Sequence, residues 1–182
     1  SMGGRQAIKT HSAGPEFLQS IDGIGTIPAA TGYTIVVVAA INSKVNGQYL
    51  WSGAGGGSAN ATSIVITELL GVRVNSNGGS AGTTVKSADK ALTQWAPAVI
   101  VMTATTGTKD SDGATIPAGV TAYVNGNKYI EIVNTPGTIK DFDGTKYATI
   151  GAYYGGTGAA DAAIGEAAIF SGVLSEKKIA SL

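Results

Sequence analysis

The chain has 182 residues, and its 27 Gly make up about 15%, twice the usual share of about 7%. Its 12 Lys and Arg balance 12 Asp and Glu, so the formal net charge is zero. This balance argues against a nucleic-acid-binding protein, which needs a basic surface, and against electrostatic docking on anionic lipid. The absence of Cys excludes disulfides and thiol nucleophiles, and no apolar run reaches the length of a membrane-spanning segment.

A chain of this length suits one domain and can bury roughly 70% of its unfolded surface. Its hydrophobic content of 43% is too high for a disordered chain. We interpret residues 1–3 as a cloning remnant, because Ser1 stands before Met2, and residues 4–182 as a single domain.

The periodicity along the chain is that of β-strands. Residues 33–41, YTIVVVAAI, form a continuous apolar and β-branched run, which is typical of a strand buried on both faces. Residues 128–133 alternate apolar and polar side chains, as in a strand that is covered on one side. The other predicted strands are residues 62–70, 71–75, 96–105, 119–124, 147–153 and 162–170.

Turn residues separate these runs. The pair Asn125-Gly126 joins two predicted strands, and it predicts a type I′ hairpin because both central residues tolerate positive φ. The Gly-rich stretches 52–60 and 75–83 are flanked closely by strands, so we interpret them as loops inside the domain rather than as linkers.

One short helix is predicted at the C-terminus. Ser175 suits its N-cap, Glu176 suits its positive end, and Leu174 and Ile179 can pack as a hydrophobic staple. Short strands at regular spacing with only this helix favour an all-β fold, a two-sheet antiparallel β-sandwich of the jelly-roll type.

Two motifs suggest catalysis or metal binding and carry little weight. Residues 78–82 match the G-x-S-x-G elbow around Ser80, but a strand-like segment follows and His11 is the single histidine. One histidine also cannot supply a multi-histidine metal site.

Two Asp pairs are candidate Ca²⁺ ligands. Asp110 and Asp112, and likewise Asp141 and Asp143, stand in D-x-D-G segments, in which two carboxylates can share a cation while Gly permits a sharp turn. The alternative is an ordinary solvated turn, because Asp and Gly are standard turn residues. Ca²⁺ is therefore the one candidate cofactor.

Aromatic side chains are the candidate ligand-binding residues, because sugars stack on aromatic faces. Tyr49 and Trp51 stand two apart, hence on one face of a strand, before a Gly-rich loop. Tyr153 and Tyr154 precede a second Gly-rich loop and point to opposite sides. We expect Trp51 and one of the two tyrosines to line a glycan site; the alternative for Trp51 is the core, which is also our expectation for Trp95.

Several segments together resemble the laminin-G-like branch of the concanavalin A-like lectin/glucanase superfamily. They are "GRQAIKT" with "YTIVVVAAI", the Trp-led run "WAPAVIVMTAT", the hairpin "TAYVNGNKY", and the ending "AAIGEAAIFSGVLSEKKIASL". The resemblance covers residues 4–182 and implies a jelly roll. Glucanases of the superfamily carry an E-x-D-x-E strand that this chain lacks, while Glu68, Glu131 and Glu166 stand far apart in the sequence. It therefore implies a protein that is not an enzyme.

We expect a carbohydrate-binding or adhesion module that recognises a host-surface glycan or receptor, without nucleic-acid or membrane partners. The low charge and the abundance of Ala, Gly and Thr resemble modules of bacteriophage tail fibres and other virion proteins. A virion or an extracellular cell surface is the expected location, and a tail fibre would make the parent protein a homotrimer. The alternatives are a purely structural module without ligand and a carbohydrate-active enzyme.

Overall fold

A computed structural model describes residues 8–10, 18–19, 25–42, 47–54, 62–67, 70–75, 92–133, 139, 141–144, 147–152 and 158–182. Within these ranges the chain forms antiparallel strands and one short helix, α1 (Glu176–Ala180). The strands are β1 (Ile8–Thr10), β2 (Leu18–Gln19), β3 (Gly25–Ile27), β4 (Tyr33–Ile41), β5 (Gln48–Ala54), β6 (Thr62–Ile66), β7 (Val72–Asn75), β8 (Pro97–Thr105), β9 (Thr108–Lys109), β10 (Thr115–Ile116), β11 (Gly119–Val124), β12 (Asn127–Val133), β13 (Phe142–Gly144), β14 (Tyr147–Ile150) and β15 (Ala162–Ser171). No helix in these ranges is long and apolar enough to cross a membrane.

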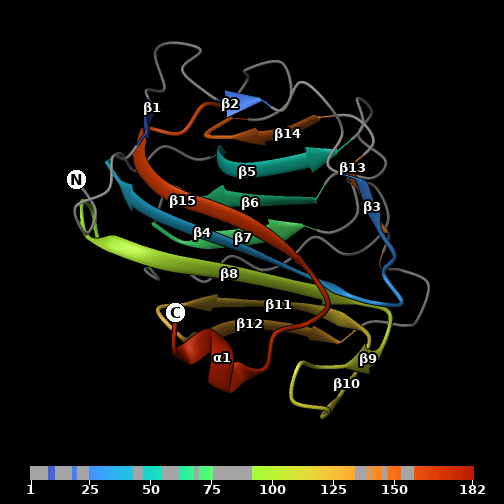
Figure 1. The fold of residues 1–182 in the computed structure, drawn as a ribbon. Helices are drawn as coiled ribbons and strands as arrows, with labels where there is room; N and C mark the ends of the chain where they lie inside the picture. Colours follow the sequence, from blue (N-terminus) through green and yellow to red (C-terminus); the bar gives the residue numbers. More distant parts are fainter. Residues whose placement is uncertain are drawn as a thin grey trace.

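The strands form two principal sheets, which confirms the predicted antiparallel sandwich (Figure 1). One has six strands in the order β1-β15-β4-β8-β11-β12, and the other has five in the order β2-β14-β5-β6-β7. The pairs β9–β10 and β3–β13 are small additional ribbons. One apolar cluster takes side chains from both large sheets, so the core lies between them.

Strand β4 runs through the middle of the six-stranded sheet and shows why its sequence is continuously apolar. Ile35 and Val37 point into the core and are fully buried. Val36, on the opposite face, is also buried, because it packs in a second cluster with Ile179 of α1. A strand covered on both faces needs apolar residues at every position.

The strand boundaries differ from the predicted ones where the backbone turns. Residues 62–70 form β6 only as far as Ile66, because the Leu70 N–H donates to the Thr67 carbonyl in a turn and Leu70 has φ of 54°. Strand β14 ends at Ile150 rather than 153, because Gly151 has φ of 87°.

The predicted hairpin is confirmed at Asn125-Gly126, which have φ of 50° and 77°. Its tip is tied to β8 because the Asn125 N–H donates to the Val99 carbonyl at 2.8 Å, and Asn125 Oδ1 accepts the Val99 N–H at 2.9 Å. A Cβ at Gly126 would lie 2.9 Å from the Ala180 Cα, so the turn also abuts the end of α1.

The predicted C-terminal helix is confirmed as well. Ser175 is its N-cap, and its side chain accepts the Lys178 N–H at 3.3 Å. Ile179 is buried and joins Leu174 against the outer face of the six-stranded sheet. This packing places α1 over the part of the sheet that carries the candidate site.

Candidate functional site

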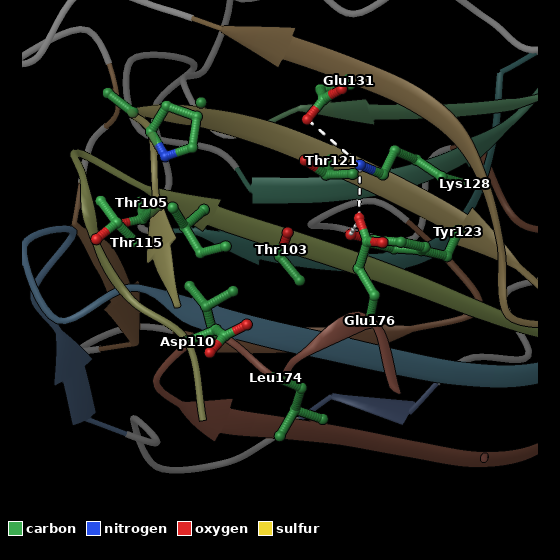
Figure 2. A pocket seen from close by; sticks show the side chains of 15 residues that line it. Thr103, Thr105, Asp110, Thr115, Thr121, Tyr123, Lys128, Glu131, Leu174 and Glu176 are labelled. Atoms are coloured by element: carbon green, nitrogen blue, oxygen red, sulfur yellow. Dashed lines mark hydrogen bonds and ion pairs between the residues drawn. The ribbon is translucent and has the colours of Figure 1, made fainter. Parts of the chain in front are cut away.

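A hollow of about 240 Å³ lies on the outer face of the six-stranded sheet, between the β9–β10 ribbon and α1. Polar and apolar side chains both line its floor and walls (Figure 2). The lining residues are Thr103, Thr105, Asp110, Thr115, Ile116, Pro117, Ala118, Gly119, Thr121, Tyr123, Lys128, Glu131, Val173, Leu174 and Glu176.

The strand register brings the floor residues together. Thr121 of β11 pairs with Thr103 of β8 on one side and with Glu131 of β12 on the other. Residues that pair across antiparallel strands share a face of the sheet. Their neighbours Met102, Ala122 and Ile130 face the core, so the polar residues face outward into the hollow.

A β-bulge in the β11–β12 pair adds a lysine to this face. Ala122 pairs with Ile130 but Tyr123 pairs with Lys128, so Tyr129 is the extra residue and is 45% exposed. A bulge inserts one residue and reverses the alternation beyond it. Lys128 therefore lies on the same face as Glu131, which strict alternation would not allow.

Lys128 forms the centre of an ionic cluster. Its Nζ lies 2.5 Å from Glu176 Oε1 and 3.4 Å from Glu131 Oε1. The hydrogen bond to Glu176 is the main cause that raises the pKa of Lys128 above its usual value. The cluster joins the N-terminal turn of α1 to the sheet and fixes three charged groups at the rim of the hollow.

Tyr123 adds a neutral donor to the cluster. Its hydroxyl donates to Glu176 Oε1 at 3.5 Å. Burial of the side chain, together with the negative charge of Glu176, raises the pKa of Tyr123 to about 12. The phenol therefore stays protonated at any physiological pH.

The lining of the hollow is net acidic. It contains the carboxylates of Asp110, Glu131 and Glu176 against the single cation of Lys128. Carboxylate and threonine oxygens accept hydrogen bonds, and hydroxyls and Lys128 donate them. The arrangement suits a ligand with many hydroxyl groups and no negative charge.

A second, more open hollow of about 520 Å³ adjoins the first. Both are lined by Asp110, Val173 and Leu174, and the second adds Thr31, Thr108, Lys109, Ser111 and Ser171, with Ala30 and Gly172. The shared residues lie where Asp110 and Val173 form an isolated bridge, with the Ser111 N–H donating to the Val173 carbonyl at 2.8 Å. A ligand too long for one hollow could extend toward the other.

Trp51 lies in the core and not on a ligand-binding surface. A bulge in β5 makes Tyr49 pair with Val65 but Trp51 pair with Ile64, so Tyr49 and Trp51 point to opposite faces instead of sharing one. Trp51 is 4% exposed and belongs to the central cluster with Ile64. This corrects the expectation of a shared face and supports the core alternative for Trp51.

The other predicted glycan-binding residues, Tyr153 and Tyr154, lie outside the described residues. Their role stays a prediction.

The opposite correction applies to Trp95, which was expected in the core. The residue stands two positions before β8, is 50% exposed, and has a backbone φ of 61°. The left-handed backbone turns the residue out of the alternation that the following apolar strand suggests.

The Asp pairs predicted to bind Ca²⁺ accept protein donors where they are described. Asp110 Oδ1 accepts the Asp112 and Ala114 N–H groups, both at 2.9 Å, and Asp141 Oδ1 accepts the Ala29 N–H at 2.8 Å. Hydrogen bonds from Ser175 and Lys178 lower the pKa of Asp112.

The side chain of Asp143 lies outside the described residues. Among the described ones, no group of three or more His, Asp or Glu could hold a metal ion. Ca²⁺ binding stays a prediction, and the observed bonds favour the alternative of ordinary turns.

Apart from Asp110, which was predicted as a Ca²⁺ ligand, the residues of the hollow were not predicted as a site. The one signal in the sequence was the alternation in residues 128–133, which places Glu131 outward. Thr103, Tyr123 and Glu176 come from β8, β11 and α1, and no local spacing connects them.

Solved structures similar to this chain are lectin-like β-sandwiches. The heptameric SAP-like pentraxin from Limulus polyphemus has a TM-score of 0.63 and 12% identity, over 99% of this chain and 76% of that one. The CBM40 of the Ruminococcus gnavus IT-sialidase, solved with α2,3-sialyllactose, has a TM-score of 0.64 and 16% identity, over 90% and 97%. The NanB sialidase from Streptococcus pneumoniae has a TM-score of 0.62 and 18% identity; this chain covers only 28% of it.

No protein-family model and no curated protein matches the sequence. At these identities the likeness shows the fold, a jelly-roll β-sandwich of the concanavalin A-like kind with a short C-terminal helix. The laminin-G-like assignment stays a prediction.

Proposed function

We propose that this domain is a non-catalytic carbohydrate-binding module and that the hollow beside α1 is its glycan site. The fold is one that solved carbohydrate-binding modules use, the Ruminococcus gnavus CBM40 among them. Fold alone does not define a ligand, so the proposal depends on the site.

The observation that carries the proposal is the lining of the hollow. Thr103, Thr115 and Thr121 place three hydroxyls around it, and Lys128, Glu131 and Glu176 add charged hydrogen-bonding groups at its rim. Its volume of about 240 Å³ is below the roughly 300–1,000 Å³ of sites for drug-sized ligands. A single sugar ring at the end of a glycan chain fits this size and chemistry.

The charge of the site selects among sugars. The CBM40 structure holds sialyllactose, whose sialic acid is anionic. Here three carboxylates face one lysine, and Lys128 is already engaged by Glu131 and Glu176. Like charges at short range repel, so the proposed ligand is a neutral sugar and not a sialic acid.

A carbohydrate-active enzyme is the alternative that the two glutamates raise. Because Glu131 and Glu176 both contact Lys128 Nζ, their Oε1 atoms are at most about 6 Å apart, near the spacing that glycosidases use. A glycosidase, however, holds its glycosidic bond between the two carboxyl groups. Here the Lys128 ammonium group takes the space between the two oxygens.

We further propose a place for the module at a virion or extracellular surface, within a laminin-G-like part of a larger, oligomeric protein such as a phage tail fibre. Its low content of charged residues, its abundance of Gly and its sequence resemblance support this. An alternative is a structural module that carries no ligand.

The test begins with the domain on a glycan array, followed by titration of bound neutral glycans against ¹⁵N-labelled protein. We expect the backbone signals of β11, β12 and α1 to shift. Thr121→Val keeps the side-chain shape and removes one hydroxyl, so affinity should fall about three- to tenfold. Lys177→Gln, on the exposed side of α1 and outside the hollow, is the matched control and should bind as the wild type does.

Three results would contradict the proposal. Binding of sialylated but not neutral glycans would show that the charge argument is wrong. Hydrolysis of the bound glycan, seen as release of a reducing sugar, would support the alternative that the domain is a carbohydrate-active enzyme. No array signal and no shifts in the hollow would favour the structural module.

A further inference from the structure

We propose a second sugar-binding surface, formed by the exposed ring of Trp95, that takes the C–H face of a neutral pyranose. It lies at the end of the sandwich where β4 ends and β8 and β15 begin, on the left in Figure 1. It shares no residue with the hollow beside α1, so it does not depend on the function proposed for that hollow.

The exposure of Trp95 is the first observation. The chain has two tryptophans; Trp51 is 4% exposed and Trp95 is 50% exposed. An indole ring is the largest apolar side chain, and folding normally buries most of it. About half of the surface of this residue is left available for contact with something outside the chain.

The backbone at Trp95 is the second observation. Its φ of 61° lies in the left-handed region, which is a genuine outlier for a bulky residue. The Trp95 N–H donates to the Ile41 carbonyl at 2.7 Å and the Ala96 N–H to the Thr93 carbonyl at 3.1 Å, so the turn is held in place. Glycine would adopt this turn without strain. Trp95 thus stabilises the fold neither through core burial nor through backbone preference, and strain of this kind concentrates at ligand-contacting sites.

The polar residues next to Trp95 are the third observation. The exposed Gln94 donates its Nε2 hydrogen to the Asn42 carbonyl, next to the Ile41 carbonyl that holds Trp95. Asn42 Nδ2 in turn donates to Asp161 Oδ2 at 2.7 Å. The amides of Gln94 and Asn42 are thereby held close to the backbone of Trp95. A pyranose has the matching surface, because its C–H groups suit the ring and its hydroxyls suit the amides.

The surroundings favour a sugar over a protein partner. Protein-binding hot spots sit inside a larger patch that excludes water. The other large apolar side chains exposed in the described residues are Tyr129 on β12, Phe170 near the far end of β15 and the terminal Leu182. Among the described residues, Trp95 is therefore an isolated exposed ring with polar neighbours along the chain. The nearby Asp161 carboxylate argues for a neutral rather than an acidic sugar.

Acrylamide quenching of tryptophan fluorescence tests the proposal directly. Acrylamide reaches the exposed Trp95 but not the buried Trp51, so the quenchable fraction reports on Trp95 alone. With lactose, cellobiose or maltose at millimolar concentration, we expect the quenching constant to fall by about half for at least one of them, because ligands lose most of their solvent exposure in such sites. Trp95→Phe should remove the quenchable component and identify it.

Two variants complete the test, with saturation-transfer NMR on the same sugars as a second readout. Trp95→Gly should keep the fold, with a melting temperature equal to or above that of the wild type, and should lose the saturation transfer that depends on the ring. Thr121→Val should keep Trp95 protection even though it weakens binding in the hollow. The proposal is overturned if none of the three sugars protects Trp95, or if folded Trp95→Gly gives the same saturation transfer as the wild type.

Discussion

Single residues in this domain take their roles from the strand irregularities beside them. Without the bulge in β5, Trp51 would share the face of Tyr49; with it, Trp51 packs against the core residue Ile64. Without the bulge in β12, Lys128 would share the face of the core residue Ile130; with it, Lys128 reaches Glu131 and Glu176. One inserted residue thus decides whether a side chain serves the core or the site.

Tyr123 gives a prediction at this scale, because its pKa of about 12 lies above the usual value of about 10. Folding favours the neutral phenol, so this stability is fully present below pH 10 and is lost as the pH rises from 10 toward 12. The melting temperature of the wild type should fall more steeply over this interval than that of Tyr123→Phe. Absorbance titration at 295 nm should also show one of the seven tyrosines ionising last, and only in the wild type. Parallel curves for the two proteins would show that burial of Tyr123 does not perturb its ionisation.

At the scale of elements, the hairpin between β11 and β12 joins two features of the fold. Its turn requires positive φ at Asn125 and Gly126, and its tip abuts the last turn of α1. The hairpin and the helix therefore support each other on the outer face of the sheet, where Val36, Val101, Tyr123 and Ile179 form their own apolar cluster.

Substitution of Gly126 tests this contact. Gly126→Val should destabilise the domain by about 1–3 kcal/mol through backbone strain at φ of 77°. The total loss should exceed this strain, because the added Cβ would lie 2.9 Å from the Ala180 Cα. Gly113→Val is the matched control, since Gly113 has φ of 89° and nothing within 4 Å of the added Cβ. Urea unfolding should therefore place Gly126→Val below Gly113→Val in free energy of unfolding. Equal losses in free energy of unfolding would mean that α1 shifts to accommodate the added Cβ and that backbone strain alone destabilises the variant.

At the scale of the whole molecule, the two sheets share one core and should unfold together. Tyr33 of the six-stranded sheet links to the other sheet through its hydroxyl, 3.3 Å from Thr62 Oγ1, and its ring packs on Phe142 with centroids 5.8 Å apart. The main apolar cluster is shared by both sheets, which favours a single cooperative transition.

The melting curve of the intact chain tests both this cooperativity and the predicted metal sites. We expect one transition with the same midpoint in Ca²⁺ and in EDTA, because Asp110, Asp112 and Asp141 already accept hydrogen bonds or pair with protein groups. A bound ion would add about 2.7 kcal/mol at a hundredfold excess over its Kd and raise the midpoint by several degrees. A Ca²⁺-dependent midpoint would establish a site, and two separated transitions would contradict the single domain.

Local sequence determined the elements of this protein whose physics is local. The apolar run of β4, the Asn125-Gly126 turn and the Ser175-capped helix each follow from the residues that form them, because burial on both faces, positive φ and capping act within a few residues. The sandwich follows from the spacing of such strands.

Only the tertiary structure decided which side chains meet. Thr103, Thr121, Glu131 and Glu176 come together through register across three elements and the docking of α1. Trp51 is buried because of the bulge in β5, and Trp95 is exposed at a position with a left-handed backbone. The physical reason is that side chains alternate along a strand with a period of exactly two residues. A β-bulge depends on the hydrogen bonds to the neighbouring strand. It therefore reverses the face on which every following side chain of its strand lies.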